Sequence, residues 1–328
     1  MKAQLKSVLR PLYHAYLSLR YKRQARQILH DYAAHHREAQ QLFASEGNAG
    51  RPSISSLAAI RVREIVPWGK DNLISLPVNY LDLVERLRRD VREKFEHSRH
   101  CWFFPKLDAQ PVPDRTQDIP AVQNGAVIAI QLRDCFNVDG LQELCAPLLP
   151  ELERKVYGAH VIVDKVYIYR NLVSYAKEQV SWTWHYDNHP TEIMKVMIYL
   201  TDVREEHGPF EYLRSTDTHE ALYMAPTPLS GYGRISATAL HRYLSNGYEG
   251  RKVTGCSGTM LLFDENVVHK ANIAKSSHRD VVVLQVRPAT FRPNAYIDPS
   301  WTGSFQHVDF NSDPYDYEPK KKVKMLSG

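Results

Sequence analysis

Apolar residues recur at intervals of three and four along the first 45 residues, with basic residues between them. This spacing places apolar side chains on one face of a helix and charges on the other, so it predicts an amphipathic helical segment. Residues 79–96 repeat the pattern, with Asn79 as the expected N-cap. The apolar face of that helix should comprise Val84, Leu87, Val91 and Phe95. A third helix should open at the capping-box spacing of Asp139–Gln142 and be divided by Pro147 and Pro150.

From residue 160 onward the pattern changes to short runs rich in Val, Ile, Tyr and Trp, separated by Gly, Pro and Asn. Such runs predict β-strands, and Ala126–Leu132 predicts one earlier strand. The expected later strands are Val161–Tyr169, Val180–Asp187, Ile193–Leu200, Phe210–Leu213, Gly258–Asp264 and Val281–Val286. Six or more short strands after a helical lead predict a mainly β fold with flanking helices, in which the strands form a two-sheet, cupin-like jelly roll.

This change of pattern divides the chain into three expected parts. Residues 1–50 are a basic helical N-terminal segment, and residues 51–290 are a single domain with its jelly-roll core at about 160–290. Residues 291–328 are an irregular C-terminal extension that ends in a lysine-rich tail.

The net charge of +5 is concentrated at the ends of the chain. Residues 1–30 contain seven Lys and Arg residues and no acidic residue, which leaves the other 298 residues at −2. A nearly neutral body argues against a groove for nucleic acid. The basic amphipathic segment suits contact of residues 1–30 with an anionic membrane surface, which would favour a lipid-linked substrate. The alternative is a helix that packs on the core with its charges in water.

Cysteine usage and hydropathy indicate the compartment. Cys101, Cys135, Cys145 and Cys256 show no C-x-x-C spacing, so we expect neither a disulfide framework nor a cysteine zinc site. No apolar run reaches the length of a membrane-spanning helix, and charged residues interrupt what would be a signal-peptide core. We therefore expect a cytoplasmic protein, with membrane association through its N-terminal segment as an open alternative.

The segment Ser181-Trp-Thr-Trp-His-Tyr-Asp187 carries the first candidate chemistry. In a strand, alternate residues share a face, so His185 and Asp187 should project together while Trp182 and Trp184 pack into the core. An H-x-D triplet alone is weak evidence, because roughly one is expected by chance. The second such triplet, at His307, lies in the irregular tail with no later histidine.

A third ligand should come from His269, which follows the strand that ends at Asp264. Two imidazoles and one carboxylate on one face of a ferrous ion leave three positions open for a cosubstrate and dioxygen. A dicarboxylate cosubstrate needs a cation for its far end, and a guanidinium fork binds a carboxylate at two points. Arg279 is the first candidate and Arg287 its competitor on the same strand. Lys195 is either a further cosubstrate residue or a solvated lysine.

These elements follow one order along the chain. A helix ends near Gly158, strands lead to His185-Tyr-Asp187, and the strand Lys195–Leu200 precedes His207-Gly-Pro-Phe; a final strand from Gly258 precedes His269 and Arg279. In this order the run from Leu141 to Pro288 resembles the phytanoyl-CoA hydroxylase-like family of iron(II)/2-oxoglutarate dioxygenases. The resemblance implies a double-stranded β-helix, iron held by His185, Asp187 and His269, and 2-oxoglutarate held by Arg279.

Two positions depart from the pattern of that family. The loop after Gly208-Pro209 reads Arg214-Ser-Thr-Asp-Thr-His219 where a Pro-Gly-Ser-His-like turn is usual, and Ala271 replaces a common Ser or Thr. The expected function is hydroxylation of a C–H bond in a small-molecule or lipid-linked substrate, with release of succinate and carbon dioxide. The alternatives are a cupin-like metal enzyme that does not use 2-oxoglutarate and a catalytically silent module that docks on membranes.

Overall fold

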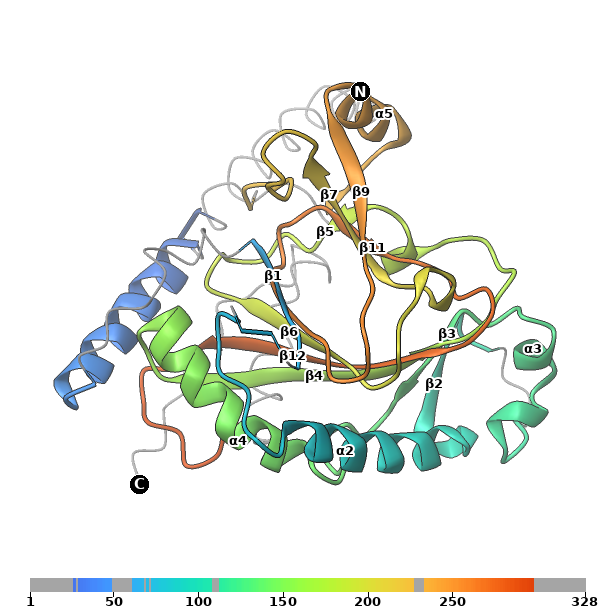
Figure 1. Ribbon diagram of the computed structural model, residues 1–328, viewed down its shortest axis with the longest axis horizontal. Helices are drawn as coiled ribbons and strands as arrows, with labels where there is room; N and C mark the ends of the chain where they lie inside the picture. The colour runs from blue at the N-terminus through green and yellow to red at the C-terminus, as the bar shows by residue number, and fades with distance from the viewer. Residues whose placement is uncertain are drawn as a thin grey trace, which may run out of the picture.

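The computed structural model describes residues 26–27, 29–48, 61–67, 69–70, 72–107, 112–226 and 233–297. Two facing antiparallel sheets form its centre, and helices cover the outer face of the larger sheet (Figure 1). The larger sheet has the strand order β1-β10-β6-β12-β4-β3-β2 and the smaller one has the order β8-β5-β11-β7-β9. The predicted mainly β fold with flanking helices is confirmed.

Eight of these strands form a double-stranded β-helix. The larger sheet contributes four adjacent strands, which are β4 (Val161–Asn171), β12 (Arg279–Pro288), β6 (Met194–Tyr199) and β10 (Met260–Asp264). The smaller sheet contributes β5 (His185–Tyr186), β11 (His269–Ala271), β7 (Phe210–Ser215) and β9 (Tyr248–Val253). The chain crosses between the sheets at almost every connection, which is the two-Greek-key arrangement of a jelly roll.

Four further strands extend these sheets. In the larger sheet β1 (Val62–Ile65) lies beyond β10, and β3 (Ala129–Leu132) and β2 (Cys101–Phe104) lie beyond β4. In the smaller sheet β8 (Gly233–Arg234) pairs with β5. The pattern of apolar residues predicted β3 but not β1, β2, β8, β9 or β11.

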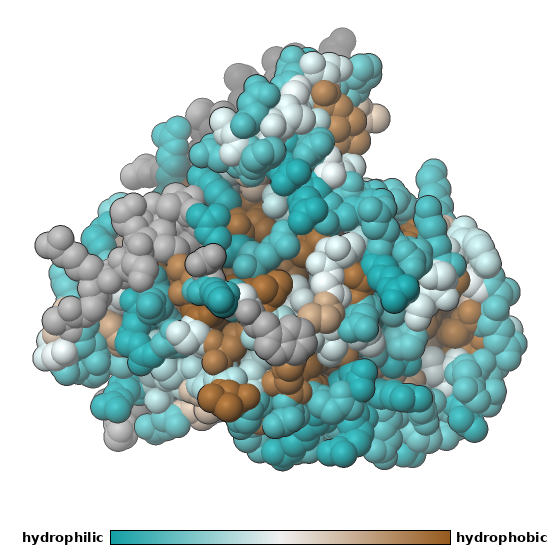
Figure 2. All heavy atoms as spheres, viewed as in Figure 1, coloured by the Kyte–Doolittle hydropathy of each residue, from teal (hydrophilic) through white to brown (hydrophobic). Residues whose placement is uncertain are grey.

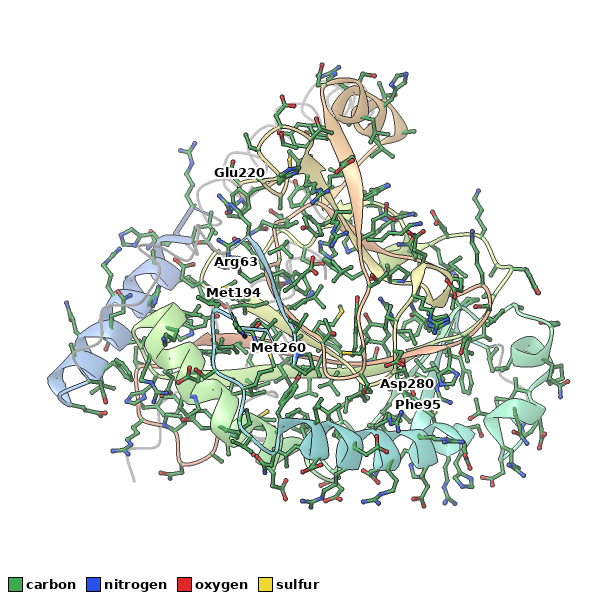
Figure 3. All side chains as sticks on the ribbon, viewed as in Figure 1. Arg63, Phe95, Met194, Glu220, Met260 and Asp280 are labelled. Carbon is green, nitrogen blue, oxygen red and sulfur yellow. The ribbon has the colours of Figure 1, made fainter. Side chains whose placement is uncertain are left out.

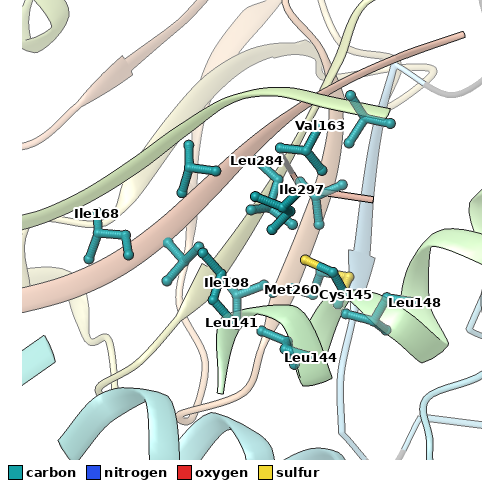
Figure 4. Close-up of a cluster of buried hydrophobic side chains, with 14 of the residues drawn as sticks. Leu141, Leu144, Cys145, Leu148, Val163, Ile168, Ile198, Met260, Leu284 and Ile297 are labelled. Carbon is teal, nitrogen blue, oxygen red and sulfur yellow. The ribbon is translucent and has the colours of Figure 1, made fainter. Parts of the chain in front are cut away.

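A helical layer covers the outer face of the larger sheet. It contains α2 (Tyr80–Phe95) and α4 (Leu141–Leu152), with short α3 (Pro120–Gln123) beside β2 and β3 (Figure 1). Leu141, Leu144, Cys145 and Leu148 of α4 pack against side chains of β4, β6, β10 and β12 (Figure 4). The expected apolar face of α2 is buried, and polar side chains cover its outer surface (Figure 2). This layer anchors the sheet whose inner face forms the site.

Two helix predictions need correction. The N-cap of α4 is Gly140 and makes no side-chain capping bond, so the capping box predicted at Asp139 is wrong. Pro147 and Pro150 lie inside α4 and do not divide it, because its buried leucines hold the helix against the sheet. A widened helical turn, Glu153–Tyr157, follows directly. Asn79 occupies the N-cap position of α2, also without a side-chain capping bond.

Residues 29–45 form a helix that packs beside α4 (Figure 1). His36 Nε2 and Gln40 Nε2 lie 3.1 and 3.0 Å from the Tyr157 carbonyl oxygen, and Ala39 is fully buried. This part of the basic segment therefore docks on the core. Residues 1–25, which carry most of the predicted membrane contact, and the lysine-rich tail lie outside the described residues. None of the helices within the described ranges is long and apolar enough to cross a membrane.

Candidate metal centre and cosubstrate cavity

Two short strands of the smaller sheet place the two histidines side by side. His185 on β5 and His269 on β11 are direct register partners, and their ring centroids lie 4.4 Å apart. Asp187 follows β5, with its Oδ1 3.5 Å from His185 Nε2 and its Oδ2 3.8 Å from His269 Nε2. One ligand atom from each residue lies within 4.8 Å of the others, and the described residues contain no second group of this kind. The three predicted ligands thus converge.

Hydrogen bonds fix the tautomer of both rings. His185 Nδ1 lies 2.8 Å from the Thr183 carbonyl oxygen, and His269 Nδ1 lies 2.7 Å from that of Val267. A carbonyl oxygen only accepts, so each Nδ1 donates and each Nε2 presents its lone pair. Burial, followed by the neighbouring charge of His185, lowers the pKa of His269 to about 3, and burial also lowers the pKa of His185. Both rings are therefore neutral, as imidazoles that bind a metal must be.

Aromatic packing holds the His269 ring in place. The Phe210 ring stacks on it with a centroid distance of 5.2 Å and an interplanar angle of 27°. The Phe263 ring meets it edge-on at 5.5 Å. Because Phe210 belongs to β7 and Phe263 to β10, both sheets orient this histidine.

Asp187 lies in a buried ionic contact. Lys195 Nζ donates to its Oδ2 at 2.6 Å, and the backbone N–H of Asp187 donates to the Glu265 carbonyl oxygen at 2.8 Å. Burial acts to raise the pKa of Asp187, but the charge of Lys195 outweighs it and holds that pKa well below its usual value. The carboxylate is therefore ionised, as a metal ligand must be. Lys195 is not a solvated lysine, since its side chain is only 17% exposed and its ammonium group donates to Asp187.

His185, Asp187 and His269, the candidate metal cluster, line a cavity of about 330 Å³ between the sheets. Arg279, the first residue of β12, lines this cavity and is fully buried. None of its three guanidinium nitrogens makes a hydrogen bond, and no carboxylate of the described residues lies within ion-pair distance. A buried cation without an acidic partner is costly, so this position is built to receive an anion.

The contacts of Asp280, the next residue of β12, explain why the Arg279 side chain points into the cavity. Asp280 faces the helical layer, where Arg170 Nε and Nη2 donate to its two carboxylate oxygens at 2.7 Å each. The Arg170 guanidinium also lies 4.9 Å from the Phe95 ring at the end of α2, close to Asp280 (Figure 3). Because alternate residues of a strand point to opposite faces, fixing Asp280 outward turns Arg279 into the cavity.

The competing arginine has a different environment. Arg287 is buried, but its Nε lies 3.8 Å from Asp164 Oδ2 and its Nη1 donates to the Pro288 carbonyl. It does not line the cavity. The pairing of β4 with β12 shifts register between Gln285 and Val286, so Arg287 lies beyond the stretch that faces the metal cluster.

One cavity residue was misplaced by the strand pattern. Val180–Trp182 forms a 3-10 turn and β5 contains only His185 and Tyr186, so the continuous strand predicted over Val180–Asp187 is wrong. The turn brings Trp182 to the cavity wall, whereas the alternation rule had placed it in the core beside Trp184. Gln131, Lys165 and Phe104 also line the cavity, and no motif pointed to them.

The donor set suits a divalent transition metal. Two imidazole nitrogens and a carboxylate without a thiolate are the ligands of ferrous iron in the two-histidine, one-carboxylate arrangement. The nearby unpartnered Arg279 supplies a counter-charge for an anion that reaches the same cavity. Fold and site together define a double-stranded β-helix protein with a candidate metal centre inside its jelly roll.

Comparison with known proteins gives distant relatives. No protein-family model matches the chain. L-proline trans-4-hydroxylase of Streptomyces griseoviridis is 24% identical over a match that covers 50% of this chain and 68% of that protein. The structure of EctD from S. alaskensis with 2-oxoglutarate and 5-hydroxyectoine is 17% identical, with a TM-score of 0.47 and coverage of 72% and 77% of the two chains. The epimerase SnoN in complex with Fe3+, alpha ketoglutarate and nogalamycin RO is 13% identical, with a TM-score of 0.43 and coverage of 81% and 87%. Similarity at this level does not define a family, so the function is argued from the site.

Proposed function

We propose that this protein is an iron(II)- and 2-oxoglutarate-dependent oxygenase of the phytanoyl-CoA hydroxylase-like kind. One observation carries the proposal: a fully buried arginine without an acidic partner shares a small cavity with two neutral imidazoles and an ionised carboxylate. A metal alone would account for His185, Asp187 and His269. Only a small molecule that binds the metal and carries a second negative charge farther from it also accounts for Arg279.

The residues then take separate roles. His185, Asp187 and His269 hold the iron, and Arg279 binds the carboxylate of 2-oxoglutarate that points away from it. Lys195 orients Asp187 through the 2.6 Å hydrogen bond. It also lines the cavity, so its contact with the cosubstrate stays a prediction. When bound, iron and 2-oxoglutarate activate dioxygen, with decarboxylation of the keto acid to succinate and oxidation of a C–H bond.

The dimensions of the cavity favour a small substrate. A volume of about 330 Å³ lies near the lower limit of ligand pockets, and the cosubstrate occupies part of it. We infer hydroxylation of a small molecule, in keeping with a relative named as a proline hydroxylase. A lipid-linked substrate would place only its reacting end in the cavity.

Two other functions are less consistent with the site. A cupin-like enzyme that does not use 2-oxoglutarate has no need of an unpartnered buried arginine. A silent membrane-docking module has no need of two buried histidines that share one tautomer and face one carboxylate. That module would take up no ferrous iron in a metal titration.

The decisive experiment compares wild type with Arg279→Met. Wild type should convert 2-oxoglutarate to succinate in the presence of ferrous iron and a substrate pool of small amino acids and sugars. Loss of the charged contact, about 2–5 kcal/mol, should lower kcat/KM for 2-oxoglutarate by about 100-fold or more. The control is Arg214→Met, which removes a surface arginine that pairs with Glu249 and should change nothing. Equal kinetics for Arg279→Met and wild type would contradict the proposal.

A further inference from the structure

The indole N–H of Trp182 is a second unpartnered polar group of the cavity wall. Trp182 is 6% exposed, and its Nε1 makes no hydrogen bond within the described ranges. Tryptophan has one donor and no acceptor, and a buried donor without a partner costs about 1–3 kcal/mol. The side chain lines the same cavity as Arg279, so a ligand in that cavity can supply the missing acceptor.

The packing of Trp182 places it at the Arg279 end of the cavity. Its ring packs with Ala129 of β3 and Ala271 of β11. Ala129 is the register partner of Asn171, and Asn171 is the register partner of Arg279. Ala129 and Arg279 therefore lie in one row on the inner face of the larger sheet, two strand spacings or about 10 Å apart at the backbone. The indole and the arginine side chain both line the cavity near this row, so a small anionic group bound in the cavity can contact both.

The other side chains of this row offer no competing donor. Ala129 and Ala271 have no polar side-chain atoms. Asn171, which lies between Ala129 and Arg279, directs its amide nitrogen to the Asn272 carbonyl oxygen at 3.2 Å. Gln131, Tyr169 and Ser181 also carry donors on the cavity wall. Compared with these three, the indole N–H and the guanidinium group are the donors that are buried without a partner among the described residues. A carboxylate has about four acceptor sites, enough for a bidentate arginine and one further N–H.

We infer that the Trp182 indole N–H donates a hydrogen bond to the same distal carboxylate of the 2-oxo dicarboxylate that Arg279 binds. This inference rests on the proposed function and adds to it a residue that selects for the length and charge of the cosubstrate. Trp182 then discriminates 2-oxoglutarate from keto acids that lack the second carboxylate.

The test measures cosubstrate binding without turnover. Protein loaded with Mn(II) is titrated with 2-oxoglutarate and, separately, with pyruvate, which keeps the keto acid but lacks the distal carboxylate. Trp182→Phe removes the N–H and keeps an aromatic ring in the Ala129–Ala271 packing. Loss of a hydrogen bond to a charged group, about 1.5–3 kcal/mol, should raise the Kd for 2-oxoglutarate roughly tenfold or more. The Kd for pyruvate should stay the same.

Trp184→Phe is the matched control, because Trp184 is two residues away and does not line the cavity. It should bind both keto acids as wild type does. If Trp182→Phe destabilises the fold, Trp182→Leu, which also lacks a donor, should give the same contrast between the two ligands. An unchanged Kd for 2-oxoglutarate, or an equal rise for both ligands, would overturn the inference and leave the proposed function intact. Absence of 2-oxoglutarate binding in wild type would overturn both.

Discussion

Lys195 shows how a single side chain can set the properties of a candidate metal ligand. Its ammonium group lies 2.6 Å from Asp187 Oδ2 and 3.8 Å from Glu265 Oε2, within a largely buried site. Without it, the largest of the effects that oppose burial in setting the pKa of the Asp187 carboxylate would be lost, together with the hydrogen bond that orients this group. Contacts of this kind behind a metal ligand typically contribute 10–100-fold to metal affinity.

We therefore expect Lys195→Met to weaken Mn(II) binding by about tenfold or more, as measured by calorimetric titration. Lys165→Met is the control, because Lys165 lines the same cavity on β4 but makes no hydrogen bond to Asp187. Equal Mn(II) affinity in Lys195→Met and wild type would show that the lysine does not support the ligand.

At the residue scale, sequence spacing was sufficient to propose the residues that converge in the site. Histidine, aspartate and arginine are uncommon in buried positions, so they stand out beside the apolar residues of a strand. This applies to His185, Asp187, His269 and Arg279. The position of Trp182 on the cavity wall was not predictable, because the alternation rule assumes an unbroken strand and a 3-10 turn interrupts it. The partner of Lys195 was equally hidden, since it depends on the approach of β6 to the segment after β5.

At the element scale, Gly208 allows its turn to pack closely against the backbone of the segment that follows β11. Its φ of +73° lies in the left-handed region, and an added Cβ would lie 2.5 Å from the Asn272 carbonyl oxygen and 2.9 Å from the Ala274 backbone nitrogen. Both neighbours are backbone atoms, so they cannot move aside as a flexible side chain would. The Gly208-Pro209 turn thus needs glycine for conformation and for space.

Gly208→Ala should lower the free energy of unfolding by about 2–4 kcal/mol, since backbone strain and steric overlap add. Urea denaturation measures the difference. Gly47→Ala separates the two effects, because Gly47 has a φ of +80° but no heavy atom within 4 Å of the added Cβ. It should lose only about 1 kcal/mol. Equal losses in the two variants would mean that the approach to Asn272 is unimportant.

The elements that the sequence predicted are the buried ones. β6, β10 and β12 are nearly continuous apolar runs because both of their faces are covered, one by the helical layer and one by the facing sheet. β9 (Tyr-Glu-Gly-Arg-Lys-Val) lies at the edge of the smaller sheet and has a mostly polar sequence, so no hydrophobic pattern marks it. α5 (Ala237–Ser245) has no buried residue and was missed for the same reason.

At the scale of the whole molecule, the helix of residues 29–45 is a separate layer beside α4. Phe43 is 4% exposed, and its ring meets the His160 ring edge-on at 5.0 Å. His160 in turn contacts Glu46 Oε2 at 2.8 Å and Glu153 Oε1 at 3.2 Å. These contacts join the end of the helix to the widened turn after α4, away from the metal cluster.

Phe43→Ala should therefore lower the free energy of unfolding by about 2–4 kcal/mol and increase amide hydrogen exchange across residues 29–45. Mn(II) and 2-oxoglutarate affinities should remain within twofold of wild type. Gln41→Ala, on the exposed face of the same helix, should leave the exchange rates unchanged. A loss of metal affinity in Phe43→Ala would show that this layer supports the site.

The sequence predicted the jelly roll and β3, but not the other strands that extend its sheets. β1, β2 and β3 widen the larger sheet to seven strands, and their pairing joins residues far apart in the chain, as in Val62 with Phe263. Local patterns carry no information on such pairing. The docking of residues 29–45 was left open for a related reason: an amphipathic helix suits a membrane or a protein surface equally well.

The solitary buried guanidinium of Arg279 has a consequence for the life of the protein in a cell. A fold that encloses an uncompensated charge is stabilised whenever a suitable anion binds to it. The free energy of unfolding then rises by RT ln(1 + [anion]/Kd), where Kd is the dissociation constant of the anion. Chains made when that anion is scarce would open more often and reach proteases sooner. The abundance of the protein would then rise and fall with the supply of the anion.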